Sequence, residues 1–158
     1  MRIGSILENQ KIEKRIAVTP EVVKKYISLG FEIYLIKDYG LHLGIKDEEF
    51  SDLGAHISND EKEILGSSDI ILQLGMLSED KSSSLKDDQI LIGVLDPYNN
   101  NEKLKNLVDK KIKPFSLELL PRITRAQSMD ILSSQANLAG YKAVIESFAN
   151  FEKAIPMM

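Results

Sequence analysis

The 158-residue sequence has no cysteine, which excludes disulfides, thiolate metal sites and cysteine nucleophiles. It has no apolar run near the ~18 residues of a membrane-spanning helix, and no secretory signal is visible at its start. We therefore expect a chain of cytosolic type that does not insert into a membrane. The net charge of −4 argues against a nucleic acid or an anionic membrane surface as a partner.

Phosphate-binding loops are absent as well. No G-x-G-x-x-G motif follows an expected strand, and the sequence has no P-loop. Gly40 and Gly44 flank a Leu-His-Leu segment, which is too bulky for a backbone that must cradle a pyrophosphate. The chain by itself is therefore predicted to be a poor nucleotide binder.

Isolated polar residues give little sign of chemistry. His42 and His56 have no metal-ligand spacing, so we expect a loop histidine, a strand-edge histidine and no metal. The acidic pairs at 48–49 and 87–88 are typical of solvated charge and of helix starts.

Short apolar runs alternate with helical patterns along the chain. A helix is expected between Thr19, a capping residue followed by proline, and Gly30, a left-handed stop. Gly54 closes a second helix by the same logic, and residues 78–88 are the most loop-like stretch. Strands are predicted at 2–7, 31–36, 55–57, 69–74, 90–95 and 113–117, and further helices at 47–53, at 101–109 and from 137 onward.

This alternation predicts the fold class. It indicates an α/β protein with an open, mostly parallel sheet and helices on both faces, of Rossmann-like or flavodoxin-like type. No linker or internal repeat divides the sequence, so a single domain spanning 1–158 is expected.

Residues 120–130 are the richest in chemistry. Within nine residues this segment holds two guanidinium groups, a carboxamide, two hydroxyls and a carboxylate, and it follows the last expected strand, where open α/β sheets place their ligand crevice. These groups can bind an amide, ribose hydroxyls or a phosphate. The alternative is a polar loop that caps the next helix through Ser128 or Asp130.

Three stretches carry a family resemblance: residues 2–20 with Glu8 and Arg15-Ile-Ala-Val-Thr-Pro, residues 40–55, and above all residues 121–141, Pro-Arg-Ile-Thr-Arg-Ala-Gln-Ser-Met-Asp followed by Ile-Leu-Ser-Ser-Gln-Ala-Asn-Leu-Ala-Gly-Tyr. They resemble the alanine dehydrogenase and transhydrogenase family. The last block is similar to its transhydrogenase branch, the N-terminal domain of the alpha subunit of proton-translocating NAD(P) transhydrogenases.

The resemblance implies a role for each residue of the loop. Arg122, Gln127 and Asp130 match the catalytic Arg-Gln-Asp loop beside the hydride-transfer site. Arg122, Asp130 and Ser133 would hold the nicotinamide carboxamide and ribose of NAD(H), and Gln127 would face NADP(H). None would act as an acid or base, since their task is to orient the rings and exclude water. The cofactor-binding set is Arg122, Ile123, Thr124, Gln127, Ser128, Met129, Asp130 and Ser133.

The same resemblance implies partners. The full enzyme would pass hydride from NADH to NADP, coupled to proton translocation. Its NAD-binding Rossmann domain would follow this domain and is absent here, and NADP(H) would sit on a partner domain next to a membrane domain or beta subunit. A homodimer on the cytoplasmic side is expected, without a metal, and this chain alone should be inactive.

Two rival interpretations remain. Alanine dehydrogenases bind pyruvate with a lysine and a histidine at strand ends where this sequence has Gln73 and Asp96, although Arg15 matches their substrate arginine. Gln73 also departs from transhydrogenases, which often keep the lysine. The second rival is a non-catalytic interaction domain with the same fold.

Overall fold

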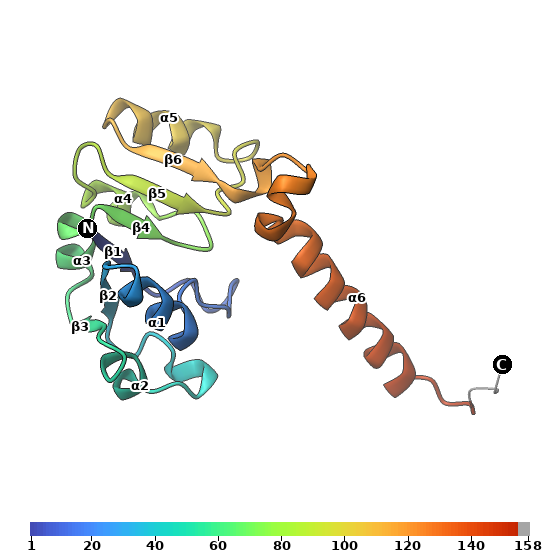
Figure 1. Ribbon diagram of the computed structural model, residues 1–158. Helices are drawn as coiled ribbons and strands as arrows, with labels where there is room; N and C mark the ends of the chain where they lie inside the picture. Colours follow the sequence, from blue (N-terminus) through green and yellow to red (C-terminus); the bar gives the residue numbers. More distant parts are fainter. Residues whose placement is uncertain (155–158) are drawn as a thin grey trace. The chain divides into compact units, whose positions relative to one another are not determined.

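The polypeptide forms two compact units, Met1–Leu117 and Glu118–Met158. The computed structural model describes residues 1–154 of the chain. The first unit contains the sheet and five α-helices, and the second contains a 3₁₀ segment and one long helix (Figure 1).

One six-stranded sheet organises the first unit. All strand pairs are parallel, in the order β3-β2-β1-β4-β5-β6, and Figure 1 shows the strands side by side in this order. The order reverses between β1 and β4, which makes that position the topological switch point. The predicted parallel α/β sheet is confirmed. The strands are β1 (Arg2–Ser5), β2 (Glu32–Ile36), β3 (His56–Ser58), β4 (Ile70–Leu72), β5 (Ile90–Gly93) and β6 (Lys113–Ser116).

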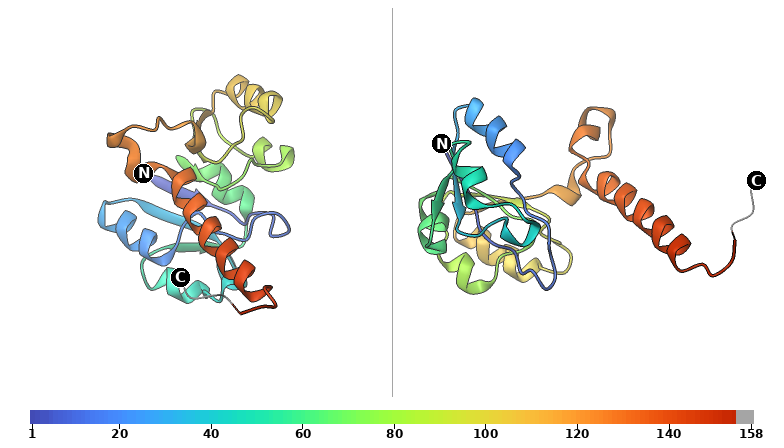
Figure 2. Two further views of the ribbon diagram at one scale, coloured as in Figure 1. Left: turned by 90° about the vertical axis from the view of Figure 1, so that its right-hand side faces the viewer. Right: turned by 90° about the horizontal axis from the view of Figure 1, so that it is seen from below.

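Helices cover both faces of this sheet, as predicted. Both views in Figure 2 place α1 on one face and α5 on the other. In addition, α3 packs across β1, β2 and β3. The helices are α1 (Pro20–Ser28), α2 (Asp47–Ser51), α3 (Glu61–Ser67), α4 (Glu79–Ser83) and α5 (Asn101–Asp109), and a 3₁₀ turn covers Leu41–Leu43.

The elements start and stop largely where local chemistry predicts. Thr19 and Pro20 begin α1, and Gly30 and Gly54 have φ values of 85° and 97°, as left-handed stops require. The loop prediction for residues 78–88 is wrong in part, because α4 lies within it. Sequence periodicity gives no signal for α3, since this seven-residue helix buries only Ile64 and Leu65.

Tyr39 is the largest side chain in the core with a polar end, and its hydroxyl is fully satisfied. The hydroxyl accepts the backbone N–H groups of Ala17 and Val18 at 3.1 and 3.2 Å. The Ser5 hydroxyl lies 2.7 Å away and donates to the carbonyl of Leu72, so the hydrogen shared with Tyr39 comes from the tyrosine. Tyr39 therefore ties the entry of α1 to β1 and β4, and burial raises the pKa of its hydroxyl.

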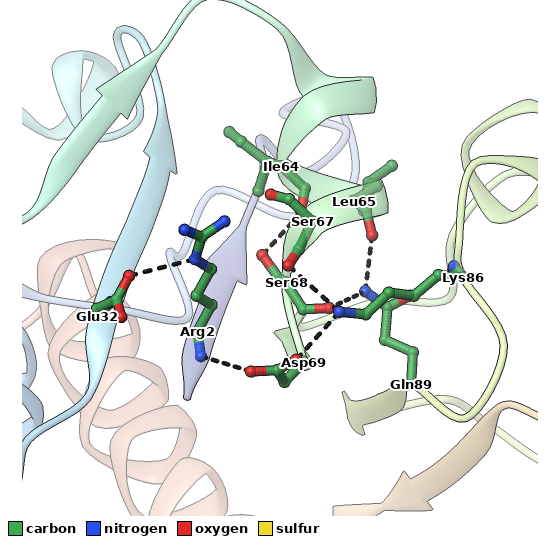
Figure 3. Close-up of polar contacts among 9 residues, drawn as sticks. All are labelled: Arg2, Glu32, Ile64, Leu65, Ser67, Ser68, Asp69, Lys86 and Gln89. Atoms are coloured by element: carbon green, nitrogen blue, oxygen red, sulfur yellow. Dashed lines mark hydrogen bonds and ion pairs between the residues drawn. The ribbon is translucent and has the colours of Figure 1, made fainter.

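A polar network joins α3 to the start of β5 (Figure 3). The buried amide of Gln89 donates to the carbonyls of Leu65 and Ser68 at 2.6 and 2.7 Å. Beside it, the Lys86 ammonium lies 3.0 Å from the carboxylate of Asp69. The two Gln89 hydrogen bonds satisfy carbonyls at the end of α3, which would otherwise be buried without partners.

The second unit consists of a 3₁₀ segment, Thr124–Met129, and α6 (Ile131–Ala149), after the 3₁₀ turn Leu117–Leu119. The sequence predicts the final helix from residue 137, but α6 begins six residues earlier because Asp130 caps it. Its apolar residues are spread around the axis rather than along one stripe, a pattern typical of helices that are covered on several sides. Within residues 1–154, no helix combines the length and apolarity needed to cross a bilayer.

Gly93 marks a close approach between β4 and β5. A Cβ atom at this position would lie 2.0 Å from the carbonyl oxygen of Gln73, which is backbone and cannot move away easily. We expect Gly93→Ala to lower the free energy of unfolding by roughly 1–3 kcal/mol, measured by urea denaturation. Gly66→Ala is the control, because its Cβ meets nothing closer than 3.6 Å and alanine favours a helix. Equal stability of the two variants would contradict this prediction.

The exposed apolar residues of α6 should drive association. Tyr141 and Phe148 are 69% and 54% exposed, and Leu138, Val144 and Ile145 are exposed beside them. Sedimentation should show dimers or larger species at concentrations on the order of 100 μM. Tyr141→Glu with Phe148→Glu should shift the chain toward monomer, while Ser134→Glu on the same helix should not. A monomeric wild-type chain would rule out this role of α6.

Candidate functional site

The predicted loop forms a pocket within the second unit. A cavity of about 320 Å³ is lined by Arg122, Ile123, Thr124, Gln127, Asp130 and Ser133. Six of the eight residues expected to bind a cofactor therefore surround one space. The other two, Ser128 and Met129, lie in the same 3₁₀ segment but do not line the cavity.

Local backbone geometry brings these side chains together. Ile123 is extended, with φ −121° and ψ 159°, and the 3₁₀ segment starts directly after it. The buried side chain of Ala126 anchors this segment, and its N–H donates to the Ile123 carbonyl at 2.9 Å. The Asp130 N–H then donates to the Gln127 carbonyl, which closes the turn before α6. The sequence thus folds back on itself within about ten residues.

Asp130 supplies the negative charge of the pocket. Its Oδ1 accepts the backbone N–H of Ser133 at 3.0 Å, and its Oδ2 accepts the Ser133 hydroxyl at 2.6 Å. These two bonds, the hydroxyl first, hold the pKa of the Asp130 carboxyl below its usual value, and the nearby Arg122 guanidinium contributes in the same direction. The carboxylate is therefore ionised at neutral pH.

Both interpretations of the loop find support in this geometry. Asp130 caps α6, as the capping alternative predicted for Ser128 or Asp130. The same carboxylate also lines a cavity beside a guanidinium and a carboxamide. A cap needs none of these neighbours, so capping alone does not account for the arrangement.

A second cavity lies at the switch point of the first unit. It measures about 470 Å³ and is lined by Glu8, Asn9, Gln73, Lys81 and Lys103, with apolar neighbours Leu7, Ile12, Met76 and Leu77. The half-buried carboxylate of Glu8 accepts the backbone N–H groups of Leu74 and Gly75. Burial raises the pKa of Glu8 despite these hydrogen bonds.

Gln73 has a structural role in this cavity. Its side chain is 3% exposed. Its Oε1 accepts the N–H of Ile6 at 3.4 Å, and its Nε2 donates to the Ile6 carbonyl at 3.2 Å. The amide thereby imitates a backbone group and continues the pairing of β1 with β4 beyond their last paired residues.

His42 lies in the turn Leu41–Leu43 and His56 in β3, as predicted for a loop and a strand-edge histidine. His42 Nε2 lies 2.7 Å from the Lys14 carbonyl and therefore donates to it, and His56 stacks on Tyr34 with ring centroids 4.7 Å apart. The acidic pair at 48–49 lies in the first turn of α2, and the pair at 87–88 faces two lysines. Among residues 1–154, no three histidine, aspartate or glutamate side chains gather as metal ligands.

A family model matches most of the chain. Residues 5–139 match the model described as "Alanine dehydrogenase/PNT, N-terminal domain". The chain belongs to this family.

Individual relatives point to the transhydrogenase branch of the alanine dehydrogenase/PNT family. An NAD(P) transhydrogenase alpha-subunit polypeptide of Rickettsia prowazekii is 44% identical over 162 residues, covering 100% of this chain and 42% of the relative. The solved transhydrogenase from Sinorhizobium meliloti has a TM-score of 0.92 and 38% identity over 100% of this chain and 47% of its own. Alanine dehydrogenase from Methanococcus maripaludis is 29% identical over 91% of this chain and 38% of its own length. The chain thus spans less than half the length of these relatives.

Residue 73 bears on the division between the branches of the alanine dehydrogenase/PNT family. Where the resemblance predicts the pyruvate-binding lysine of alanine dehydrogenases, this chain has Gln73, whose amide is already bound to the backbone of Ile6. Asp96, at the place of the expected histidine, has a φ of 45° and accepts the side-chain amide of Asn99 at 2.8 Å. Both side chains thus stabilise strand ends and turns in this member of the family.

Sequence reasoning did not predict the hydrogen bonds between Glu8 and the backbone of Leu74 and Gly75 in this family member. Glu8 entered only as part of the resemblance, and nothing in its spacing connects it with Leu74 and Gly75. A weak signal existed, because an acidic residue soon after the first strand of an open α/β sheet faces the switch point.

Glu8 should make stability depend on pH. Its raised pKa means that the folded chain binds this proton more tightly than the unfolded chain does. The resulting stability is fully present below the ordinary pKa near 4.5 and is lost as pH rises through the folded pKa. Glu8→Gln, which imitates the protonated form, should therefore gain on wild type between about pH 4 and about pH 7. The gain should stay below about 1 kcal/mol, since solvent screens a half-exposed group.

Urea unfolding at the two pH values measures this difference. Glu152→Gln, at an exposed position after α6, is the matched control and should show no such trend. A variant whose stability relative to wild type does not change with pH would show that Glu8 is not the responsible group.

Proposed function

We propose that this chain supplies the loop that orients nicotinamide rings in an NAD(P) transhydrogenase. Arg122, Gln127 and Asp130 are its catalytic residues in the sense that they touch the reacting nucleotides. Ile123, Thr124 and Ser133 complete the pocket, and Ser128 and Met129 flank it on the 3₁₀ segment. The observation that carries the proposal is the convergence of six of these residues on one cavity.

The chemistry of the pocket fits a nicotinamide group. Arg122 offers only donors, Asp130 and Ser133 offer acceptors, and Gln127 offers both. The carboxamide and the ribose hydroxyls of a nicotinamide nucleotide need both hydrogen-bond donors and hydrogen-bond acceptors. Ile123 adds an apolar wall for the ring. Similarity to transhydrogenase alpha subunits along the whole of this chain supports the assignment.

The residues divide the work between two nucleotides. Arg122, Asp130 and Ser133 hold the nicotinamide and ribose of NAD(H), and Gln127 faces NADP(H). The nucleotides supply the chemistry: a hydride leaves the reduced ring of NADH and joins the oxidised ring of NADP⁺, giving NAD⁺ and NADPH. The loop orients the rings and excludes water, which is where a direct transfer gains its rate.

The complete enzyme needs further components. These are an NAD-binding second domain, a domain that binds NADP(H), and a membrane domain or beta subunit that couples the transfer to proton translocation. The apolar surface of α6 is a suitable contact for the domain that would follow or for a second copy in a homodimer. We place this domain on the cytoplasmic side and expect the chain alone to be inactive.

The first unit gives no support to the alanine dehydrogenase alternative. Gln73 has neither the charge to polarise an oxo acid nor a free amide, because both ends of its amide contact Ile6. A non-catalytic interaction domain is the outcome that remains if the loop has no effect on hydride transfer.

The test uses the active transhydrogenase of Rhodospirillum rubrum, whose alpha subunit contains a segment 39% identical to this chain. This chain replaces that segment, and the variants are made in the resulting enzyme. Gln127→Asn shortens the side chain by one methylene and keeps its chemistry. Single-turnover hydride transfer should slow by about tenfold to a thousandfold, because small displacements are costly in a direct transfer. NADH affinity, measured by calorimetry, should change little, since Gln127 faces the other nucleotide.

Two further variants separate the roles. Arg122→Ala should weaken NADH binding as well as transfer, because Arg122 is assigned to NAD(H). Arg125→Ala is the control, since Arg125 belongs to the same loop but does not line the cavity. Unchanged transfer in Gln127→Asn with wild-type folding would return the loop to a purely capping role.

A further inference from the structure

We propose that the cavity at the switch point of the first unit binds a small aliphatic monocarboxylate, whose charge is held by Lys81 and Lys103. This cavity of about 470 Å³ is lined only by residues of the first unit. It shares no residue with the loop that carries the proposed transhydrogenase function. The two proposals therefore stand or fall separately.

The position and the size of the cavity favour a small ligand. Part of its lining, including Glu8, follows β1, and another part, including Gln73, follows β4. The cavity thus lies at the carboxyl ends of the two strands between which the strand order reverses. Open α/β sheets bind their ligands in this place, and a volume of this size is typical of small-molecule sites.

Lys81 is held in place by two acceptors of the protein. Its Nζ lies 3.1 Å from the carboxylate of Glu61 and 3.5 Å from the carbonyl oxygen of Leu7. An ammonium group has three hydrogens, so one remains for a ligand in the cavity that Lys81 lines. Because these contacts already restrict the side chain, binding costs it little further conformational entropy.

The charges of the lining favour a single negative charge on the ligand. Lys81 and Lys103 are positive, and Glu8 is the one acidic residue of the lining. Within residues 1–154, Lys103 has no ion-pair partner, whereas the Glu8 carboxylate already accepts the backbone N–H groups of Leu74 and Gly75. The lining therefore attracts an anion and repels a cation.

The apolar part of the lining fits an aliphatic chain. Leu7, Ile12, Met76 and Leu77 contribute to it, and the side chain of Ile12 is 84% exposed. An alkyl group attached to the carboxylate would remove apolar surface from water here. The Gln73 amide does not compete for the ligand, because both of its ends contact Ile6. A carboxylate with a short alkyl chain thus matches both parts of the cavity.

The test compares butyrate with its uncharged isostere butyramide and with acetate, at one ionic strength. Binding to the ¹⁵N-labelled chain of 158 residues is followed by the backbone amide shifts of Glu8, Leu74, Gly75 and Lys81. Probe concentrations reach the tens of millimolar that weak fragments require. Butyrate should bind about three- to tenfold more tightly than butyramide because of its charge. It should bind about five- to fifteenfold more tightly than acetate because of its two further CH₂ groups.

Three variants test the residues themselves. Lys103→Gln should lower the affinity for butyrate toward that for butyramide. Lys105→Gln is the control, because it removes the same charge from the exposed surface of α5 but does not line the cavity. Glu8→Gln removes a negative charge from the lining and should tighten butyrate binding, a gain that a misfolded chain cannot produce.

Several results would overturn the inference and leave the proposed function standing. These are equal affinities for butyrate and butyramide, equal losses in Lys103→Gln and Lys105→Gln, and weaker butyrate binding in Glu8→Gln. Amide shifts confined to residues 122–133, or no shift at the cavity residues with any probe, would overturn it as well.

Discussion

The double pairing of β1 holds the first unit together. This strand pairs with β2 on one side and β4 on the other, so the two halves of the sheet are joined through it. Gly4 lets the end of α3 pack closely on this strand, because a Cβ there would lie 2.3 Å from the Ser68 hydroxyl. Beyond the strand ends, Gln73 and Glu8 continue the attachment through hydrogen bonds to backbone groups. The switch point is thus fastened by side chains where backbone pairing stops.

Asp130 both caps α6 and lines the cavity of the second unit. Its carboxylate starts α6 by accepting the Ser133 N–H, and it orients the Ser133 hydroxyl with its other oxygen. Loss of the aspartate would therefore affect both the helix and the pocket. Substitutions at position 130 must therefore be chosen to separate the effect on the helix start from the effect on the cavity.

Gln73 has a structural role at the switch point. A lysine there would carry a charge to the crevice at the switch point, as the resemblance to alanine dehydrogenases implies. Gln73 is buried and bound at both ends of its amide to Ile6. The charged groups of the crevice are Glu8, Lys81 and Lys103. The Gln73 side chain carries no charge that could polarise a substrate.

Short-range chemistry determined much of this protein. Apolar runs located the strands, Gly30 and Gly54 ended helices, and α5 covers the predicted residues 101–109. The pocket could also be anticipated, because its six residues lie within twelve positions and one turn gathers them. The short helices α3 and α4 escaped prediction, since one or two turns give too little periodicity.

Contacts between distant segments were decided by the tertiary structure. Glu8 meets Leu74 because β1 lies beside β4, and Tyr39 meets both Ser5 and Val18 because β2 lies on the other side of β1. The sequence records each residue type but not its partner, since a hydrogen bond between distant segments depends on strand order and register. Local turns and caps can be predicted from neighbouring residues, whereas the hydrogen bonds of Glu8 at the switch point form only once the sheet has formed.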